Sequence, residues 1–301
     1  RQRQMCIRDS LIILFGCLHA VATAQSTTGI DKLQQQVSLE LAKANGLFAV
    51  AFKDLATGQT VLINDKQSFH AASTMKTPVL VEIMNQAKEG KFSLKDSILV
   101  KNSFSSIVDG SPFSLEASDD SEPELYKQIG QKKTIEALAY DMIIASSNLA
   151  TNLMIELVKA ENVMATLKTL GANDIRVLRG VEDKKAFEKG LNNSTTAYDL
   201  LLLFERIATN KMVSKKACKQ MVEILLDQRF NEIIPAKLPA TVKVAHKTGS
   251  ITGIQHDTGI VYLPDGRKYV LVLLSKFEGD EKNAVETMAT VSKIVYDYMM
   301  Q

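Results

Sequence analysis

Apolar residues recur along the chain with two different periods, and the switch between these periods predicts the order of the elements. Residues 30–45 carry apolar side chains at helical spacing and end at Asn45-Gly46, a pair typical of a helix C-terminus. Residues 47–53 and 59–63 are short β-rich runs on either side of a polar segment, which predicts a hairpin. The first part of the chain is therefore predicted to form a helix followed by two strands.

The middle of the chain keeps a helical period. The segments with this period are residues 77–88, 133–159, 160–170, 197–210 and 215–227. Residues 109–124 interrupt the pattern and are rich in Ser, Asp and Glu, so we interpret them as a solvated loop.

Strand patterns return towards the C-terminus, and one more helix follows them. The β-rich segments are residues 241–247, 255–263 and 268–274, and a Pro-Asp-Gly sequence predicts a tight turn before the last of them. Residues 282–300 form an amphipathic helix pattern. Because helices and strands at both ends surround a helical middle, the predicted fold is an antiparallel α/β sheet flanked by terminal helices, with an inserted all-α domain.

This order also predicts where the domains begin and end. The α/β domain is discontinuous, with residues 25–72 and 236–301, and the all-α domain is residues 73–235. Together they form a single catalytic unit, residues 25–301. One unit of this length can bury a sizeable core.

The first 24 residues are interpreted as a leader that is not part of the folded unit. An apolar run over residues 11–21 is about half the length of a membrane-spanning helix and ends in Ala22-Thr23-Ala24, a small-x-small cleavage site. A secretory signal peptide of this kind predicts export to the periplasm or the medium. The alternatives are a buried N-terminal helix and a lipoprotein site at Cys17. Residues 1–10 resemble translated cloning sequence and are interpreted as non-native.

Composition and charge exclude several classes of partner. With 46% hydrophobic and 23% charged residues, the chain has the composition of a globular protein. Its formal charge of +2 is carried by the first ten residues, so neither a nucleic-acid nor a membrane partner is expected for the remainder. Beyond residue 24 Cys218 is the single cysteine, and His70, His246 and His256 lack metal-ligand spacing. We therefore expect neither an internal disulfide nor a bound metal.

The first candidate chemical motif is Ser73-Thr74-Met75-Lys76, where a helical pattern begins. Lys76 lies one turn after Ser73 on the same helical face, and the serine oxygen lies near the positive end of the helix dipole. A lysine that is shielded from water and has a lowered pKa can take the proton of a serine hydroxyl. On its own this pattern is also that of an N-capping serine beside an exposed lysine.

Two further motifs follow in a fixed order. Ser146-Ser147-Asn148 interrupts an apolar stretch, where a serine and an asparagine must find partners or face a cleft. Lys247-Thr248-Gly249 ends a predicted strand, and its glycine permits another backbone or a ligand to approach closely. In this order S-x-x-K, S-x-N and K-T-G resemble the three motifs of class A β-lactamases and penicillin-binding proteins. The resemblance extends over residues 25–301.

The resemblance implies a role for each motif residue. Ser73 is similar to the nucleophile that becomes acylated, and Lys76 to its activating lysine. Ser146 resembles the residue that relays a proton to the leaving nitrogen. The residues that resemble substrate-binding positions are Asn148 for the side-chain amide, Lys247 and Thr248 for the carboxylate, Gly249, and Ser250, whose N–H would complete an oxyanion hole with that of Ser73. Asn152 is similar to an asparagine that braces this region.

The chain also departs from the family pattern. Ser147 stands where β-lactamases usually have aspartate. The family holds the hydrolytic water with a glutamate two residues after an arginine on an Ω-shaped loop, with an asparagine four residues further on. Here Glu182 follows Arg179 by three residues, and Ala186 occupies the asparagine position. Glu182 is a candidate general base, and the alternative is a loop glutamate paired with Arg179 or Lys184.

Two further site assignments carry alternatives. Phe104 is predicted to form an aromatic wall of the substrate cleft, or to be a buried core residue. Family members often carry an arginine near the strand after K-T-G, but this chain has none there, so His256 or Thr258 would replace it.

Three functions fit these motifs. The first is β-lactam hydrolysis through an acyl-enzyme on Ser73. The second is a D-alanyl-D-alanine peptidase that β-lactams acylate and that releases the acyl group only slowly. The third, a β-lactam sensor domain, needs a membrane-spanning segment, which the sequence does not contain. We expect the first, with a small-molecule β-lactam as partner, no cofactor, and a monomer.

Overall fold

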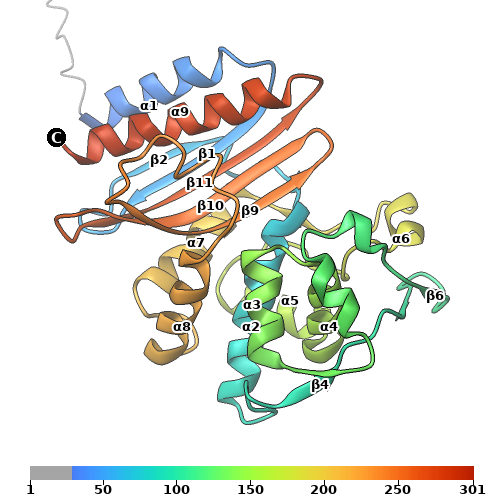
Figure 1. The fold of residues 1–301 in the computed structure, drawn as a ribbon. Coiled ribbons are helices and arrows are strands. Elements are labelled where there is room, and N and C mark those ends of the chain that lie inside the picture. Colours follow the sequence, from blue (N-terminus) through green and yellow to red (C-terminus); the bar gives the residue numbers. More distant parts are fainter. Residues whose placement is uncertain (1–28) are drawn as a thin grey trace, which may run out of the picture.

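A five-stranded antiparallel sheet joins the two ends of the chain. Its strands lie in the order β2-β1-β11-β10-β9, so the first strand pairs with the last. The strands are β1 (Gly46–Asp54), β2 (Thr60–Ile63), β9 (Lys243–Ile251), β10 (Ile254–Tyr262) and β11 (Lys268–Phe277). The computed structural model describes residues 29–301 (Figure 1), so the predicted leader and signal peptide lie outside the described residues.

Two helices from opposite ends of the sequence cover one face of this sheet. Helix α1 (Gly29–Leu41) and helix α9 (Glu281–Met299) lie side by side on it (Figure 1). In α1 the buried residues are Leu33, Val37 and Leu41, whose spacing of four puts them on one stripe. These side chains join a core cluster with alternate residues of the strands, so burial of apolar surface holds the terminal helices on the sheet.

The rest of the helices lie beyond the opposite face and build a second, larger core. Helix α7 (Ala197–Ala208) packs directly on the sheet, against β1, β10 and β11. The remaining helices are α2 (Lys76–Lys88), α3 (Ile135–Ile144), α4 (Asn148–Val158), α5 (Ala160–Thr169), α6 (Lys184–Glu188) and α8 (Lys215–Leu226). The predicted fold, an antiparallel sheet with terminal helices and a helical middle, is confirmed. The division into domains at residues 72/73 and 235/236 stays a prediction.

Short elements connect the helices and carry site residues. A 3₁₀ turn, η1 (Ala72–Met75), leads directly into α2. The short strand pairs are β3 (Phe69–His70) with β8 (Ser194–Thr195), β4 (Ser97–Leu99) with β7 (Lys132–Thr134), and β5 (Phe104–Ser105) with β6 (Pro112–Phe113). The remaining 3₁₀ turns are η2 (Ala117–Asp119) and η3 (Pro123–Gln128).

The structure differs from the predicted elements at two motifs. The single helix predicted over residues 133–159 is two helices, because Ser146 has a φ of 55° that no helix continues through and Ser147 caps the second helix. The K-T-G sequence lies within β9 rather than at its end, since the strand runs on to Ile251. Both differences concern polar residues whose partners lie far away in sequence.

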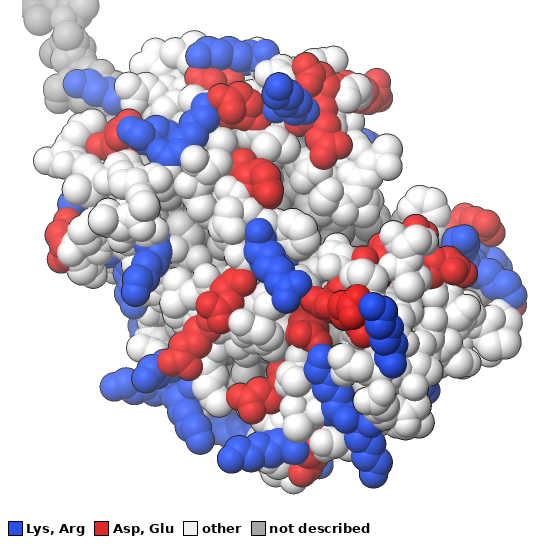
Figure 2. Space-filling model, in the orientation of Figure 1, with Lys and Arg blue, Asp and Glu red and all other residues white. Residues whose placement is uncertain are grey.

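The last features of the fold are the charge of its surface and the hydropathy of its helices. On the face shown in Figure 2, acidic and basic side chains are interspersed rather than gathered by sign. Within residues 29–301, no helix is both long and apolar enough to cross a membrane.

Candidate active site

A cleft of about 1100 Å³ lies between the edge strand β9 and the helical part of the molecule. Such a volume suits a small-molecule ligand. Among the residues that line it are six of those predicted from the sequence: Ser73, Ser146, Asn148, Glu182, Thr248 and Ser250. The cleft therefore brings together residues from all three motifs.

Ser73 is held in the cleft by a strained backbone turn. Ala72, the preceding residue, has a φ of 45°, a conformation that costs a residue with a side chain on the order of 1 kcal/mol. Its N–H donates to Nδ1 of His70 at 3.0 Å, and this contact supports the turn. Strand β9 passes close behind, because a Cβ at Gly249 would lie only 3.2 Å from the amide nitrogen of Ser73. The glycine is thus required for the close approach of the two backbones.

Lys76 is fully buried and joins the first motif to the second. Its Nζ donates to the backbone oxygen of Ser146 at 2.6 Å, to Oγ of Ser146 at 3.2 Å and to Oδ1 of Asn148 at 3.0 Å. Burial lowers the pKa of Lys76 to about 7, against the opposing effect of the carboxylates of Asp120 and Glu182. Near neutral pH this lysine is therefore able to accept a proton as well as to donate one.

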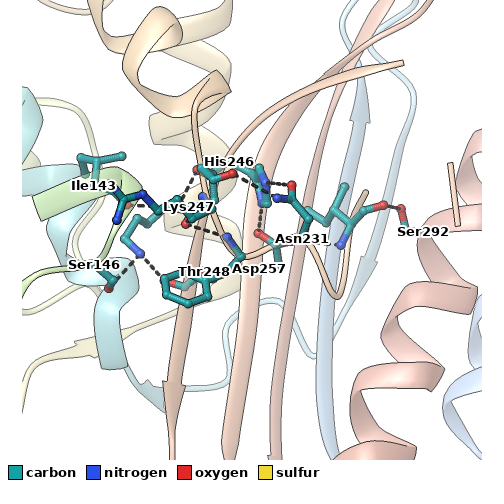
Figure 3. Close-up of polar contacts among 12 residues, drawn as sticks. Ile143, Ser146, Asn231, His246, Lys247, Thr248, Asp257 and Ser292 are labelled. Atoms are coloured by element: carbon teal, nitrogen blue, oxygen red, sulfur yellow. Dashed lines mark hydrogen bonds and ion pairs between the residues drawn. The ribbon is translucent and has the colours of Figure 1, made fainter. Parts of the chain in front are cut away.

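Lys247 approaches the same serine from the other side. Its Nζ lies 3.1 Å from Oγ of Ser146 and 2.9 Å from the backbone oxygen of Thr248 (Figure 3). Burial, and then the neighbouring Lys76, lower the pKa of Lys247 well below its usual range. The Ser146 hydroxyl thus bridges two buried amines, an arrangement that can pass a proton between them and a bound ligand.

Strand β9 is anchored behind Lys247 by a buried polar pair. Nδ1 of His246 lies 2.8 Å from Oδ1 of Asp257, and its Nε2 lies 3.3 Å from Oδ1 of Asn231 (Figure 3). Asp257 also accepts a hydrogen bond from the amide of Ile234 at 2.9 Å. His246 points away from the cleft, as a strand histidine does, and it positions the strand that carries Lys247.

The loop before α6 is tied to α4 by an asparagine. Asn152 donates from Nδ2 to the backbone oxygen of Val181 at 3.0 Å and accepts from the Val181 amide at 2.7 Å. A Cβ at Gly180 would lie 2.1 Å from Oδ1 of Asn152, so only glycine permits this pairing. The buried guanidinium of Arg179 donates to the backbone oxygens of Leu191 and Gly180. These contacts fix the loop that presents Glu182.

Glu182 itself is exposed at the cleft, with a φ of 62° that turns it out of the loop. Nδ2 of Asn148 lies 3.5 Å from its Oε1, a long contact. The ion pairs found within residues 29–301 include none between Glu182 and Arg179 or Lys184, and the role of Glu182 as general base stays a prediction. The carboxylate faces the cleft beside Asn148.

The structure bears on two sequence assignments at the cleft wall that were left with alternatives. Phe104 is 5% exposed and packs against Phe113 in the larger core, so it is a core residue rather than an aromatic wall. His256 and Thr258 are fully buried and are not among the residues that line the cleft. Gln255 lines the cleft instead, and its Nε2 donates to Oγ of Ser250 at 2.7 Å.

A buried carboxylate beside the second motif was not indicated by the sequence pattern. Asp120 lies in the segment expected to be a solvated loop, yet it is 7% exposed and accepts hydrogen bonds at the start of α4. An indirect signal in the sequence was Ser147 at the middle of the second motif, where the resemblance implies an aspartate. Its partner lies 27 residues away, and no local pattern reveals that.

No group of three or more His, Cys, Asp and Glu side chains in residues 29–301 is arranged to hold a metal ion. The chemistry available in the cleft is that of a serine hydroxyl beside buried amines, with a carboxylate at its rim.

Comparisons with known proteins agree with this geometry. The β-lactamase VEB-1 from Pseudomonas aeruginosa is 22% identical to this chain, with 98% of each chain covered. The TLA-1 extended-spectrum β-lactamase has a TM-score of 0.79 at 20% identity, over 91% of this chain and 100% of that one. A variant of PBP-A, solved as an acyl-enzyme complex with penicillin G, has a TM-score of 0.76 at 25% identity, over 89% and 96%.

The extent of the family match is decisive. The model of the β-lactamase enzyme family matches residues 32–299, which include all three motifs and both parts of the sheet. With its motifs converging on one cleft and a match of that length, the chain belongs to the β-lactamase enzyme family.

Proposed function

We propose that the protein is a serine β-lactamase of the class A type, which hydrolyses the β-lactam amide through an ester on Ser73. The observation that carries the proposal is the position of Lys76: it is fully buried, has a pKa of about 7, and is hydrogen-bonded to Ser146 and Asn148, which line the same cleft as Ser73. A buried amine of this kind is what a serine needs for activation at neutral pH.

Acylation uses Ser73, Lys76, Ser146 and Ser250. Oγ of Ser73 attacks the β-lactam carbonyl carbon while its proton passes to neutral Lys76. The N–H groups of Ser73 and Ser250 stabilise the developing oxyanion, each contributing on the order of 3 kcal/mol. The amide C–N bond then breaks, and the leaving nitrogen takes a proton through the Ser146 hydroxyl. The products of this step are an acyl ester on Ser73 and an opened ring.

Substrate binding and deacylation use other residues that line the cleft. Thr248 and Ser250 line the cleft beside Lys247, so a hydroxyl pair and a nearby amine are available for the substrate carboxylate. Asn148 is available for the side-chain amide. Water then attacks the ester carbon and Glu182 takes the water's proton. As the ester C–O bond breaks, this proton passes to Oγ of Ser73, which restores the free hydroxyl and the ionised Glu182. No cofactor takes part in these steps.

All these groups come from one chain, so a monomer suffices for the reaction. The substrate is a small molecule that acts outside the cytoplasm, and we therefore also propose that the protein is exported.

The second candidate is a D-alanyl-D-alanine peptidase that penicillin acylates without rapid release. The long contact of Glu182 and its offset from Arg179 favour slow deacylation, and the likeness to PBP-A fits this alternative. Both candidates share the acylation step and differ in the fate of the ester.

A chromogenic cephalosporin tests the proposal when product is followed through the first turnover and beyond. Sustained turnover that Ser73→Ala abolishes supports the β-lactamase. A burst of about one equivalent followed by near silence favours the peptidase. Absence of a burst, with no mass increase on the protein, rules out the assignment of Ser73.

A further inference from the structure

The carboxylate of Asp120 is placed at the start of α4, where the S-x-N motif lies. Its Oδ2 accepts from the amide of Leu149 at 2.8 Å, from the hydroxyl of Tyr126 at 3.0 Å and from Oγ of Ser147 at 3.3 Å. Its Oδ1 accepts from the amide of Glu122 at 2.9 Å. Four donors on one buried carboxylate make a fully satisfied polar anchor.

This anchor acts on the two residues that flank Ser147. Asn148 begins α4, and a negative charge at a helix N-terminus stabilises the helix through its dipole. Ser146 precedes the cap with a φ of 55°, a conformation that persists only where its surroundings hold it. Ser146 and Asn148 are also the two side chains that contact Nζ of Lys76.

Ser147 caps this helix end without bringing a charge to it. Its hydroxyl caps the helix by accepting from the amide of Ala150 at 3.2 Å, and its hydrogen points at Asp120. The charge at this helix end therefore comes from a different segment of the chain.

We propose that Asp120 is a positioning residue for the reaction, supplying from the 109–124 loop the carboxylate that the middle of the S-x-N motif lacks and holding Ser146 and Asn148 against Lys76. This inference rests on the proposed function, since its effect on rate is an effect on acylation of Ser73.

The pH dependence of acylation distinguishes this role from mere structural support, because the charge of Asp120 acts on Lys76. The carboxylates that act on Lys76 are Asp120 and Glu182, which favour its cationic form, and Lys76 in turn lowers the pKa of Lys247. Removal of the Asp120 charge should lower the pKa of Lys76, and acylation should then begin at lower pH. Loss of positioning should lower the pH-independent rate.

The experiment measures acylation by penicillin G across pH in Asp120→Asn, Ser147→Asp and the double variant of the full chain. In Asp120→Asn we expect the midpoint of the acylation rate against pH to fall by about one pH unit. The rate on the high-pH plateau of the same curve should fall by at least about tenfold. Ser147→Asp alone should also be impaired, because it places two carboxylates together. The double variant should regain both midpoint and plateau.

A matched control is Glu124→Gln, which removes an exposed acid from the same loop and should leave rate and midpoint unchanged. If Asp120→Asn folds but keeps the midpoint, or if the double variant recovers neither quantity, the proposal is overturned.

A second readout does not depend on acylation. Amide hydrogen exchange at Leu149 should be faster in Asp120→Asn than in the wild type and should slow again in the double variant, because the carboxylate holds that amide. If the wild type is not acylated yet shows this pattern, the proposed function fails and the positioning role survives. Unchanged exchange would contradict the positioning role itself.

Discussion

The Nζ atom of Lys76 donates a hydrogen bond of 2.6 Å to the backbone oxygen of Ser146, a residue 70 positions further along the chain. This contact holds the S-x-x-K turn and the S-x-N turn as one unit. It also buries the lysine amine, which is the main cause of its lowered pKa. The predictions below follow from this unit and from the contacts that surround it.

Acylation should depend on pH through Lys76. Because the pKa of Lys76 is about 7 and the neutral amine accepts the proton of Ser73, the acylation rate should rise through pH 7 and fall about tenfold per unit below it. Stopped-flow measurement of acylation on both sides of pH 7 checks this. Lys76→Arg, which stays cationic, should lower the plateau by about 10²- to 10⁴-fold. A wild-type rate that is flat across this range would contradict the role.

Glu182→Gln should trap the acyl-enzyme. The amide cannot take the proton of the attacking water, so deacylation should slow by about 10²- to 10⁴-fold while acylation is largely kept. Mass spectrometry after mixing with penicillin G should show the ester accumulating on Ser73. Glu188→Gln, an exposed acid on α6, is the matched control. Unchanged turnover in the Glu182 variant would remove Glu182 from the mechanism.

Asn152→Ala should loosen the loop that presents Glu182. It removes two hydrogen bonds to Val181 from a side chain that is 3% exposed, which should lower the free energy of unfolding by about 1–3 kcal/mol. Deacylation should slow more than acylation, since the loop carries the base. Urea unfolding and single-turnover kinetics measure the two effects. Asn162→Ala, which removes one hydrogen bond to Val158 away from the cleft, should leave the ratio of the two rates unchanged.

Stability should fall in acid because of His256. Burial lowers its pKa from 6.5 to about 4, so the folded state favours the neutral ring. The contribution of His256 to the free energy of unfolding is fully present above pH 6.5. It is lost as the pH falls towards 4, by about 3 kcal/mol in total. Urea unfolding of the wild type and of His256→Gln across this window should give curves that converge in acid. Parallel curves would show that His256 is not the titrating group.

The order of helices and strands was predictable because it depends on local periodicity. The stripe of Leu33, Val37 and Leu41 predicted α1 and its buried face, and the β-rich runs near the C-terminus predicted β10 and β11. The three motifs were visible for the same reason, since each lies within four consecutive residues. Their shared cleft was expected from resemblance and not from the residues themselves.

Tertiary structure decided which polar side chains reach the cleft. The sequence left Phe104 open between the cleft wall and the core and offered His256 or Thr258 as a substrate contact; all three are buried, because the side of a strand that faces the core depends on what packs there. Asp120 was expected to be solvated and is buried, because its donors on Ser147 and Leu149 come from a distant helix. A sequence pattern does not contain such pairings.

The sequence by itself determined the order of helices and strands and the order of the motifs, because side-chain periodicity and motif spacing are properties of neighbouring residues. Only the tertiary structure decided the lowered pKa of Lys76, the orientation of Glu182 and the carboxylate at the start of α4. Each of these depends on burial and on the distance between groups brought together from remote parts of the chain, and such distances exist only once the chain has folded.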